Sequence, residues 1–313
     1  MRDDRNVLAA LVPLAASQLG LNEDLVEKDF WVTEILRSLQ SVPDGVSLIF
    51  KGGTSLSKGF ALIERMSEDV DILLHGENLS NVVRNTSLVD ITSTVSRHIG
   101  IKAVTVHSEK GRKLVSRFMY GEKEMRIGTP GVLLELGFRG HPQPSRKVTM
   151  TSYLAQYVAS RSDRDEIQYQ EFAPVTLELL APERTLLEKI FAVHCAAEKV
   201  PESAEEVRLM ARYYYDIKLL LDNADVRDGL RKLGNLETYC RVELIAAGVG
   251  QPFPGPDRPA GGYAESLAFH PGVALLEVLE PAYAAALEFV FLSKPRPSLL
   301  ECINTVIRWA EIL

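Results

Sequence analysis

The chain has 313 residues, of which 46% are hydrophobic and 25% charged, and its formal net charge is −7. This composition is ordinary for a globular protein, and the length suits one large domain or two ordinary ones. No apolar run approaches the ~18 residues that a membrane span needs. The acidic balance argues against broad, non-specific coating of nucleic acid, although a local basic patch remains compatible with it.

Three widely spaced cysteines, an odd number, argue against a disulfide framework or a zinc knuckle and fit a reducing compartment. The first residues carry mixed charge, and the apolar stretch after them is broken by Pro13, so we do not expect a signal peptide. These features predict a cytoplasmic protein without a membrane segment.

A first amphipathic helix is predicted over residues 22–39, with Asn22 as its N-cap and a stripe of apolar residues along one face. Residues 27–33 of this helix are unusually rich in charged and aromatic side chains. Either they form an exposed turn beside a core Trp31, or they lie near a functional pocket. Residues 43–45, Pro-Asp-Gly, are expected to end the helix.

The most informative stretch is residues 46–74. An apolar run leads into Gly52-Gly53, and Leu56, Phe60 and Ile63 then follow the spacing of a short helix. The next apolar run reads as a strand that carries Asp69 and Asp71 on one face, because side chains alternate along a strand. Val70, Ile72 and Leu74 occupy the other, core-facing side. Two carboxylates on one face repel each other unless a cation offsets the repulsion.

This pattern favours a site for Mg²⁺ and a nucleoside triphosphate. Mg²⁺ prefers carboxylates together with substrate phosphates, and paired glycines let the backbone approach phosphates closely at a helix N-terminus. A Walker A loop does not fit, since Ser57 rather than glycine precedes Lys58. A lone Gly-Gly is usually a turn and a lone Asp-x-Asp a solvated strand, but the two in this order indicate catalysis. The predicted nucleotide contacts in this stretch are Lys51, Gly52, Gly53, Thr54, Ser55, Lys58 and Ser67.

A helix over residues 85–98 and a strand meander follow. Its predicted strands are residues 101–107, 114–120, 124–127 and 131–138, with residues 121–123 as a short hairpin connection. Glu135 alternates with apolar residues on the last strand. A buried, unpaired carboxylate is costly, so Glu135 is expected to join Asp69 and Asp71 as a third acidic group. The alternative is an edge strand with Glu135 in water.

Basic residues cluster between Lys110 and Arg164, where they either confer solubility or form a surface for RNA or a partner. The members are Lys110, Arg112, Lys113, Arg117, Lys123, Arg126, Arg139, Arg146, Lys147, Arg161 and Arg164. Tyr153, Tyr157 and Tyr169 are nearby in sequence, and the sequence leaves open whether they line the same groove.

The pattern becomes helical after a last apolar run at residues 175–180. Helices are predicted over residues 184–198, 203–221, 271–291 and 298–313, with Pro182 at a helix start. The Pro- and Gly-rich stretch at residues 248–262 is expected to be a long loop with little reason to pack. We therefore predict an α/β domain with a mixed sheet and flanking helices at residues 1–175, followed by a mainly helical domain at 176–313. His194 lies on an apolar stripe and reads as a core residue rather than a metal ligand.

Four blocks of this sequence resemble the AbiEii/AbiGii toxin family of nucleotidyltransferases. They are residues 27–33 (Glu-Lys-Asp-Phe-Trp-Val-Thr), the Gly-Gly and Asp-x-Asp stretch, residues 182–189 (Pro-Glu-Arg-Thr-Leu-Leu-Glu-Lys) and residues 212–217 (Arg-Tyr-Tyr-Tyr-Asp-Ile). The resemblance implies a nucleotidyltransferase fold in the first domain. It also implies that Lys28 or Asp29 lies near the pocket and that Lys189 reaches the nucleotide phosphates.

The last block places Arg212 and Asp216 four residues apart on one helix face, which by itself indicates a surface ion pair worth a few tenths of a kcal/mol. The resemblance instead implies that Asp216 positions Lys189 or the base and that Arg212 contributes to nucleotide binding. The predicted catalytic residues are thus Asp69, Asp71, Glu135, Lys189 and Asp216, the first three of them as ligands of one or two Mg²⁺.

The resemblance further implies a toxin restrained by an antitoxin encoded nearby. The expected reaction is transfer of a nucleoside monophosphate (NMP) from a nucleoside triphosphate (NTP) to RNA, with the 3′ end of tRNA as the expected acceptor, by a monomeric enzyme. Two alternatives stay open: transfer to a protein hydroxyl, and a non-catalytic module that binds NTP and acts through protein contacts. Motifs fix neither the acceptor nor the preferred base.

Overall fold

The structure is a computed structural model that describes residues 1–2, 4–42, 45–65, 67, 69–121, 130–161, 169–200, 204–240, 255–289 and 296–313. The chain divides into two units. Unit 1 comprises residues 1–59, 66–139 and 145–179, and unit 2 comprises residues 60–65, 140–144 and 180–313. Unit 1 contains the sheet, and unit 2 is mainly helical, so the predicted class, an α/β fold with a helical second part, is confirmed.

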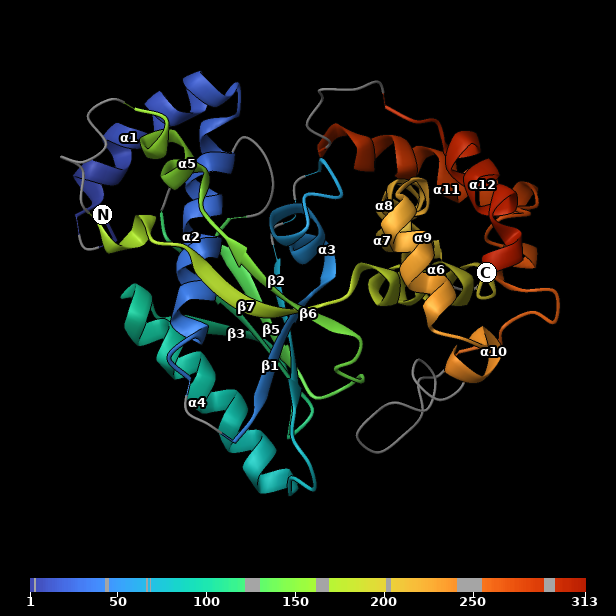
Figure 1. Cartoon of the computed structure of the whole chain (residues 1–313), viewed down its shortest axis with the longest axis horizontal. Helices are drawn as coiled ribbons and strands as arrows, with labels where there is room; N and C mark the ends of the chain where they lie inside the picture. Colours follow the sequence, from blue (N-terminus) through green and yellow to red (C-terminus); the bar gives the residue numbers. More distant parts are fainter. Residues whose placement is uncertain are drawn as a thin grey trace. The chain divides into compact units, whose positions relative to one another are not determined.

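Within the described residues, seven strands form one mixed sheet in the order β3-β4-β5-β2-β1-β7-β6 (Figure 1). The β3-β4-β5 meander is antiparallel, β5 and β2 are parallel, and β1 is antiparallel to β2 and parallel to β7. The strands are β1 (Ser47–Lys51), β2 (Asp69–His75), β3 (Ala103–Glu109), β4 (Lys113–Phe118), β5 (Val132–Gly137), β6 (Ser145–Met150) and β7 (Val175–Leu180). The sequence predicted β1 to β5, described residues 175–180 only as an apolar run, and missed β6.

One face of the sheet is covered by α2 (Glu23–Leu39) and α4 (Asn81–Ile99), which also pack on each other (Figure 1). Asn22 caps α2 as predicted, because its side chain accepts a hydrogen bond from the Asp24 backbone N–H. Ser80 caps α4 in the same way, so this helix starts four residues earlier than expected. Val70, Ile72, Leu74, Leu134 and Leu136 of the sheet are buried, which confirms the predicted core face.

Two further helices of unit 1 were not predicted. They are α1 (Arg5–Leu19) and α5 (Tyr153–Ala159), which pack on each other and on α2. Pro13 lies inside α1, yet the helix forms because Asp4 caps it and Leu8, Val12, Ala15 and Ala16 bury one face. Tertiary packing thus outweighs the low helix propensity of proline. A short 3₁₀ turn, η3 (Gln170–Phe172), precedes β7.

The helix predicted after Gly52-Gly53 is shorter than expected. A three-residue turn, α3 (Gly52–Thr54), continues as a single π-helical turn, η1 (Ser55–Gly59), and residues 60–64 are irregular. The helical conformation does not continue because Ala61 adopts a positive φ of 52°. A Cβ atom at Gly59 would lie 2.2 Å from Cδ2 of Leu179, so the close approach of these residues favours glycine at position 59. Leu56 and Ile63 are nevertheless buried.

Unit 2 is built from helices that pack on one another, with α8 in contact with α6, α9, α11 and α12. Its elements are α6 (Pro182–Ala197), α7 (Ala204–Met210), α8 (Arg212–Asp222), α9 (Ala224–Lys232), α10 (Leu236–Tyr239), η5 (Tyr263–Glu265), α11 (Val273–Ala286), η6 (Leu287–Phe289), α12 (Leu299–Arg308) and η7 (Ala310–Ile312). Pro182 stands in the first turn of α6, as predicted. A capping box between Ser298 and Glu301 starts α12.

Two predictions for the helical part need correction. The helix expected over residues 203–221 is divided at Ala211, which is buried and takes part in i→i+3 backbone hydrogen bonds that tighten the chain there. The loop at residues 248–262 was expected to have little reason to pack. Its described part packs tightly: Gly255 lies against Cys195 and Phe191, and the Arg258 guanidinium donates to the Leu313 carbonyl oxygen.

Several predicted features lie outside the described residues. They are the strand at 124–127, most of the hairpin connection at 121–123, the basic residues Lys123, Arg126 and Arg164, and residues 248–254 of the long loop. Among the described helices, none is long and apolar enough to cross a membrane.

Candidate active site

The turn α3 (Gly52–Thr54), called the glycine turn below, brings the backbone against a carboxylate. Gly52 follows β1 with a φ of +77°, a conformation that L side chains rarely adopt. A Cβ atom at this position would lie 2.1 Å from Oδ2 of Asp71 and 3.0 Å from its Cγ. Only glycine therefore fits here, and the main chain of the turn lies directly beside the second carboxylate of the Asp-x-Asp pair.

The two carboxylates lie on one face of β2, as predicted, and both are half-buried. Asp71 is the direct cross-strand neighbour of Lys51 in β1 and of Glu135 in β5. Side chains at directly paired positions project to the same face of a sheet. Lys51, Asp71 and Glu135 thus form a row across three adjacent strands. Asp69 lies on the same face of β2, two residues before Asp71.

The sequence left two alternatives for Glu135: a third acidic group beside Asp69 and Asp71, or an edge strand in water. The edge strand is wrong, and the first alternative stays a prediction. Glu135 lies on β5 between β4 and β2, and its Oε1 is 2.8 Å from Nζ of Lys113 on β4. Both side chains are about one-third exposed. Lys113 was predicted only as a member of the basic cluster, so this partner was missed.

The donor set at β2 fits Mg²⁺ in its chemistry, since Asp69 and Asp71 offer hard oxygen ligands beside a backbone that only glycine can form. Among the described residues, no group of three or more acidic, histidine or cysteine side chains is gathered closely enough to hold a metal ion. The role of Glu135 as a third ligand therefore stays a prediction.

The hydroxyls after the glycines hold the turn in place. Thr54 Oγ1 donates to the Asp69 carbonyl oxygen and lies 2.8 Å from the Ser67 hydroxyl. The buried Ser55 hydroxyl donates to the Gly52 carbonyl oxygen at 2.9 Å. These bonds tie the glycine turn to the start of β2, so the structure brings Gly52, Thr54, Ser67 and Asp69 together.

Lys58 is held by an acidic residue from α2. Its Nζ is 2.5 Å from Oδ1 of Asp29 and also donates to the Thr151 carbonyl oxygen at 3.0 Å. The second oxygen of Asp29 accepts from the backbone N–H of Tyr153 at the start of α5. Asp29 thus joins α2, the glycine turn and α5. The neighbouring Lys28 is buried.

The later blocks of the sequence meet in unit 2. Lys189 on α6 and Asp216 on α8 are both buried, and Lys189 Nζ lies 2.8 Å from Oδ2 of Asp216. The same carboxylate accepts two hydrogen bonds from Arg65, each of 2.6 Å. Lys189 Nζ also lies 3.8 Å from the centre of the Tyr213 ring. The spacing of Arg212 and Asp216 indicated a surface ion pair, but the partners of Asp216 are Arg65 and Lys189.

Arg212, the residue four positions before Asp216, is exposed, and its guanidinium lies 5.7 Å from the Tyr213 ring centre. Arg65 was missed as a functional candidate because a charged residue just before a strand is usually solvated. Burial alone would raise the pKa of Asp216, but the charges of Arg65 and Lys189 and their hydrogen bonds lower it to about 2. Asp216 is therefore ionised across the physiological pH range.

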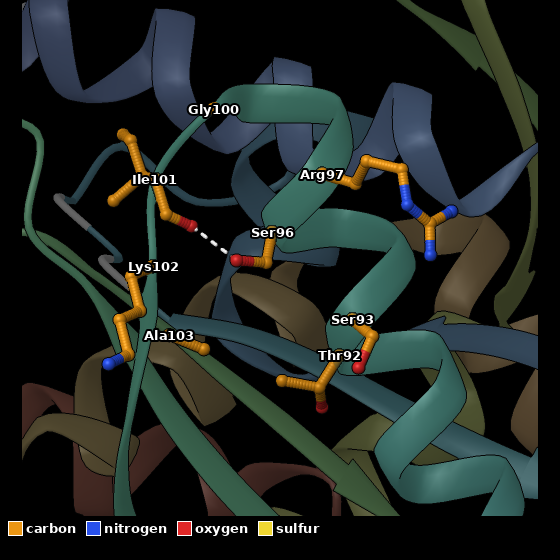
Figure 2. A pocket seen from close by; sticks show the side chains of 8 residues that line it. All are labelled: Thr92, Ser93, Ser96, Arg97, Gly100, Ile101, Lys102 and Ala103. Atoms are coloured by element: carbon orange, nitrogen blue, oxygen red, sulfur yellow. Dashed lines mark hydrogen bonds between the residues drawn. The ribbon is translucent and has the colours of Figure 1, made fainter.

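A depression of about 460 Å³ lies elsewhere in unit 1, where the end of α4 meets the start of β3 (Figure 2). None of its lining residues is a predicted site residue. The Ser96 hydroxyl donates to the Ile101 carbonyl oxygen at 2.6 Å. The side chains of Arg97 and Lys102 point away from each other (Figure 2). They do not converge on a ligand position.

His194, predicted as a core residue, is buried and hydrogen-bonded. Its Nδ1 lies 2.7 Å from the Ser266 hydroxyl and its Nε2 3.1 Å from the Asp257 carbonyl oxygen. In the basic cluster, Arg112, Arg139, Arg146 and Lys147 are exposed. Of the three nearby tyrosines, Tyr157 is buried and Tyr169 is exposed.

Two comparisons with known proteins found matches. A family model described as "Nucleotidyl transferase AbiEii toxin, Type IV TA system" matches residues 34–304. Among solved structures, the chain is similar to MenT4, a nucleotidyltransferase toxin from Mycobacterium tuberculosis H37Rv, with 18% sequence identity, 96% of each chain covered and a TM-score of 0.46. None of the curated proteins compared with the chain matches it.

Proposed function

Since this chain belongs to the nucleotidyltransferase AbiEii toxin family of type IV toxin–antitoxin systems, we propose that it transfers an NMP from an NTP to an RNA acceptor in a Mg²⁺-dependent reaction. The observation that carries the proposal is the contact between the Gly52 backbone and Asp71, with Asp69 on the same face of β2. The acceptor we propose is the 3′ end of tRNA, whose modification would inhibit translation.

In this proposal Asp69 and Asp71 hold Mg²⁺, which when bound supplies positive charge against the triphosphate. The Gly52–Gly53 main chain lies along the phosphates, and Lys51, Thr54, Ser55, Lys58, Ser67 and Arg212 remain proposed nucleotide contacts. The 3′-hydroxyl oxygen of the acceptor forms a bond to the α-phosphorus, and the bond from this phosphorus to the bridging oxygen breaks. Pyrophosphate leaves, and the hydroxyl proton passes to a carboxylate, for which Glu135 is the candidate.

Catalysis by such a site comes from positioning and from stabilising charge. Lys189 is the proposed cation for the leaving pyrophosphate, and Asp216 its partner. Two features support this. The ammonium of Lys189 is ion-paired to a carboxylate that stays ionised at neutral pH, and it lies over an aromatic ring that restricts its movement. We also propose that residues 1–175 form the catalytic domain and that residues 176–313 contribute Lys189 and Asp216 to the reaction.

An RNA acceptor is supported by exposed basic side chains in the unit that carries the carboxylates. Arg112 and Lys147 are exposed there, and basic side chains of this kind bind a phosphate backbone, even though the whole chain is acidic. We further propose that an antitoxin restrains the activity, in keeping with the type IV toxin–antitoxin family, and that the enzyme acts as a cytoplasmic monomer.

The test is a transfer assay with purified protein, Mg²⁺, total cellular RNA and each α-³²P-labelled NTP in turn. Label on RNA of tRNA size is the expected result, and it would also identify the base. Asp71→Ala should lower transfer by about 10²-fold or more, because it removes a proposed ligand of the Mg²⁺ that offsets the charge of the reacting phosphates. The matched control is Asp90→Ala, which removes an exposed carboxylate from α4 of the same unit.

Label on protein instead of RNA would mean that the acceptor is a protein hydroxyl and not tRNA. NTP binding without transfer to any acceptor would favour the non-catalytic alternative. Transfer that survives in Asp71→Ala would refute the assignment of the site.

A further inference from the structure

The buried polar cluster of Arg65, Asp216 and Lys189 in unit 2 contains an arginine with no role assigned so far. Arg65 is 5% exposed, and it donates from Nε to Oδ1 and from Nη2 to Oδ2 of Asp216, with both distances 2.6 Å. This is a bidentate pair, in which two parallel hydrogen bonds fix the orientation of the carboxylate as well as its position. Asp216 itself has no exposed surface.

Lys189 depends on the same carboxylate. Its Nζ contacts Oδ2, the oxygen that also accepts from Nη2 of Arg65. A rotation of the Asp216 carboxylate would therefore move the acceptor of Lys189. Lysine carries a flexible four-carbon stem, so its ammonium is located by its partners rather than by its own side chain.

We propose that Arg65 is a positioning residue for nucleotide binding: it locks the Asp216 carboxylate so that the Lys189 ammonium is held where it meets the triphosphate. This inference rests on the proposed role of Lys189. Arg65 itself makes no contact with the nucleotide in this scheme and acts through Asp216. A lysine at position 65 would keep the charge but lose the two-pronged geometry, because an ammonium is a point charge and a guanidinium is a planar fork.

The test measures equilibrium binding of each NTP and of its NMP, in the presence of Mg²⁺, to the wild type and to Arg65→Lys. The NTP dissociation constant is expected to rise about tenfold or more, the scale of a lost hydrogen bond to a charged group, while the NMP constant stays within about twofold. If Arg65 only stabilises the fold, Arg65→Lys should weaken the binding of NTP and of NMP to the same extent. The matched control is Arg227→Lys, a half-buried arginine of the same unit that donates to the Leu221 carbonyl oxygen and lies over Trp309.

A double-mutant cycle then asks whether Arg65 acts through Lys189. In the Lys189→Gln background, Arg65→Lys should cause no further loss of NTP affinity, since the group that it positions is gone. Losses that multiply across the two sites, or an equal loss for NTP and NMP, would overturn the proposal. Where Arg65→Lys does not fold, Asp216→Glu provides the same test. It keeps the charges and moves the carboxylate by one methylene, and it must show the same NTP-selective loss.

The two proposals can fail separately. If Lys189→Gln binds NTP as tightly as the wild type does, the proposed role of Lys189 is wrong. If Lys189→Gln loses NTP affinity but Arg65→Lys does not, Lys189 keeps its role and only the inference about Arg65 is wrong.

Discussion

Replacing Gly52 by alanine is the most direct way to test the glycine turn. The new methyl group would lie 2.1 Å from Oδ2 of Asp71, whereas an ordinary contact between non-bonded atoms is about 3.5 Å. The carboxylate would have to move by more than about 1 Å to make room. The new methyl group would also lie 3.0 Å from Cγ and 3.3 Å from Cβ of Asp71, so rotating only the end of the Asp71 side chain does not relieve the collision.

The two consequences differ in size. A positive φ costs an alanine roughly 1–2 kcal/mol, and the collision adds about 1 kcal/mol or more, depending on how far Asp71 yields. A displacement of about 1 Å at a catalytic group can lower the rate about 10²-fold. We therefore expect Gly52→Ala to lose most of its transfer activity while it loses only a moderate part of its stability.

Gly20→Ala is the matched control. Gly20 ends α1 with a φ of +67°, close to the +77° of Gly52, and nothing lies within 4 Å of the position that its Cβ would occupy. It carries the same kind of backbone strain without the collision. Urea unfolding of both variants and the α-³²P transfer assay give the two measurements, and only Gly52→Ala should lose activity.

Equal transfer activity in the two alanine variants would contradict the reasoning, because it would show that Asp71 can move without affecting the reaction. A loss of activity in Gly20→Ala that matches its loss of stability would instead mean that the assay reports folding and not the site.

Two other predictions follow from buried ion pairs. The pKa of Asp216 is about 2, below its ordinary 3.8, so this group should contribute about 2 kcal/mol of stability above pH 4, and the contribution should disappear as the pH falls from about 4 to 2. Measured by urea unfolding, the stability difference between the wild type and Asp216→Asn should shrink over this range, and a difference independent of pH would contradict the assignment. Lys58→Met leaves the Asp29 carboxylate buried without its cation and should cost about 3 kcal/mol, most of it recovered in Lys58→Met/Asp29→Asn. If NTP affinity falls in Lys58→Met and is not recovered in the double variant, Lys58 is a nucleotide contact as predicted; unchanged affinity would make it purely structural.

Local signals in the sequence were sufficient for the strand–turn–strand frame of the site. The apolar run of β1, the paired glycines and the alternation around Asp69 and Asp71 each depend on residues close in the chain, and the structure has all three. The register between strands was not available, because it depends on residues far apart in sequence. The neighbours of Asp71 across the sheet, Lys51 and Glu135, therefore follow only from the fold.

Charged pairs were the least predictable feature. The i, i+4 spacing of Arg212 and Asp216 indicated a surface pair, but α8 turns Asp216 inward to meet Arg65, which is 151 positions away in the chain. Lys113 and Glu135, and likewise Asp29 and Lys58, are brought together by strand pairing or helix packing. The helix after Gly52-Gly53 was overestimated because the spacing of apolar residues does not report the positive φ of Ala61, at which the helical conformation does not continue.

The sequence by itself thus determined the family and the fold class, because motifs, periodicity and residue type are local properties of the chain. Only the tertiary structure decided which charges meet, which of them are buried and which backbone atom lies against Asp71. Burial and pairing are set by contacts between distant segments, and these contacts control both the pKa of Asp216 and the space beside Gly52.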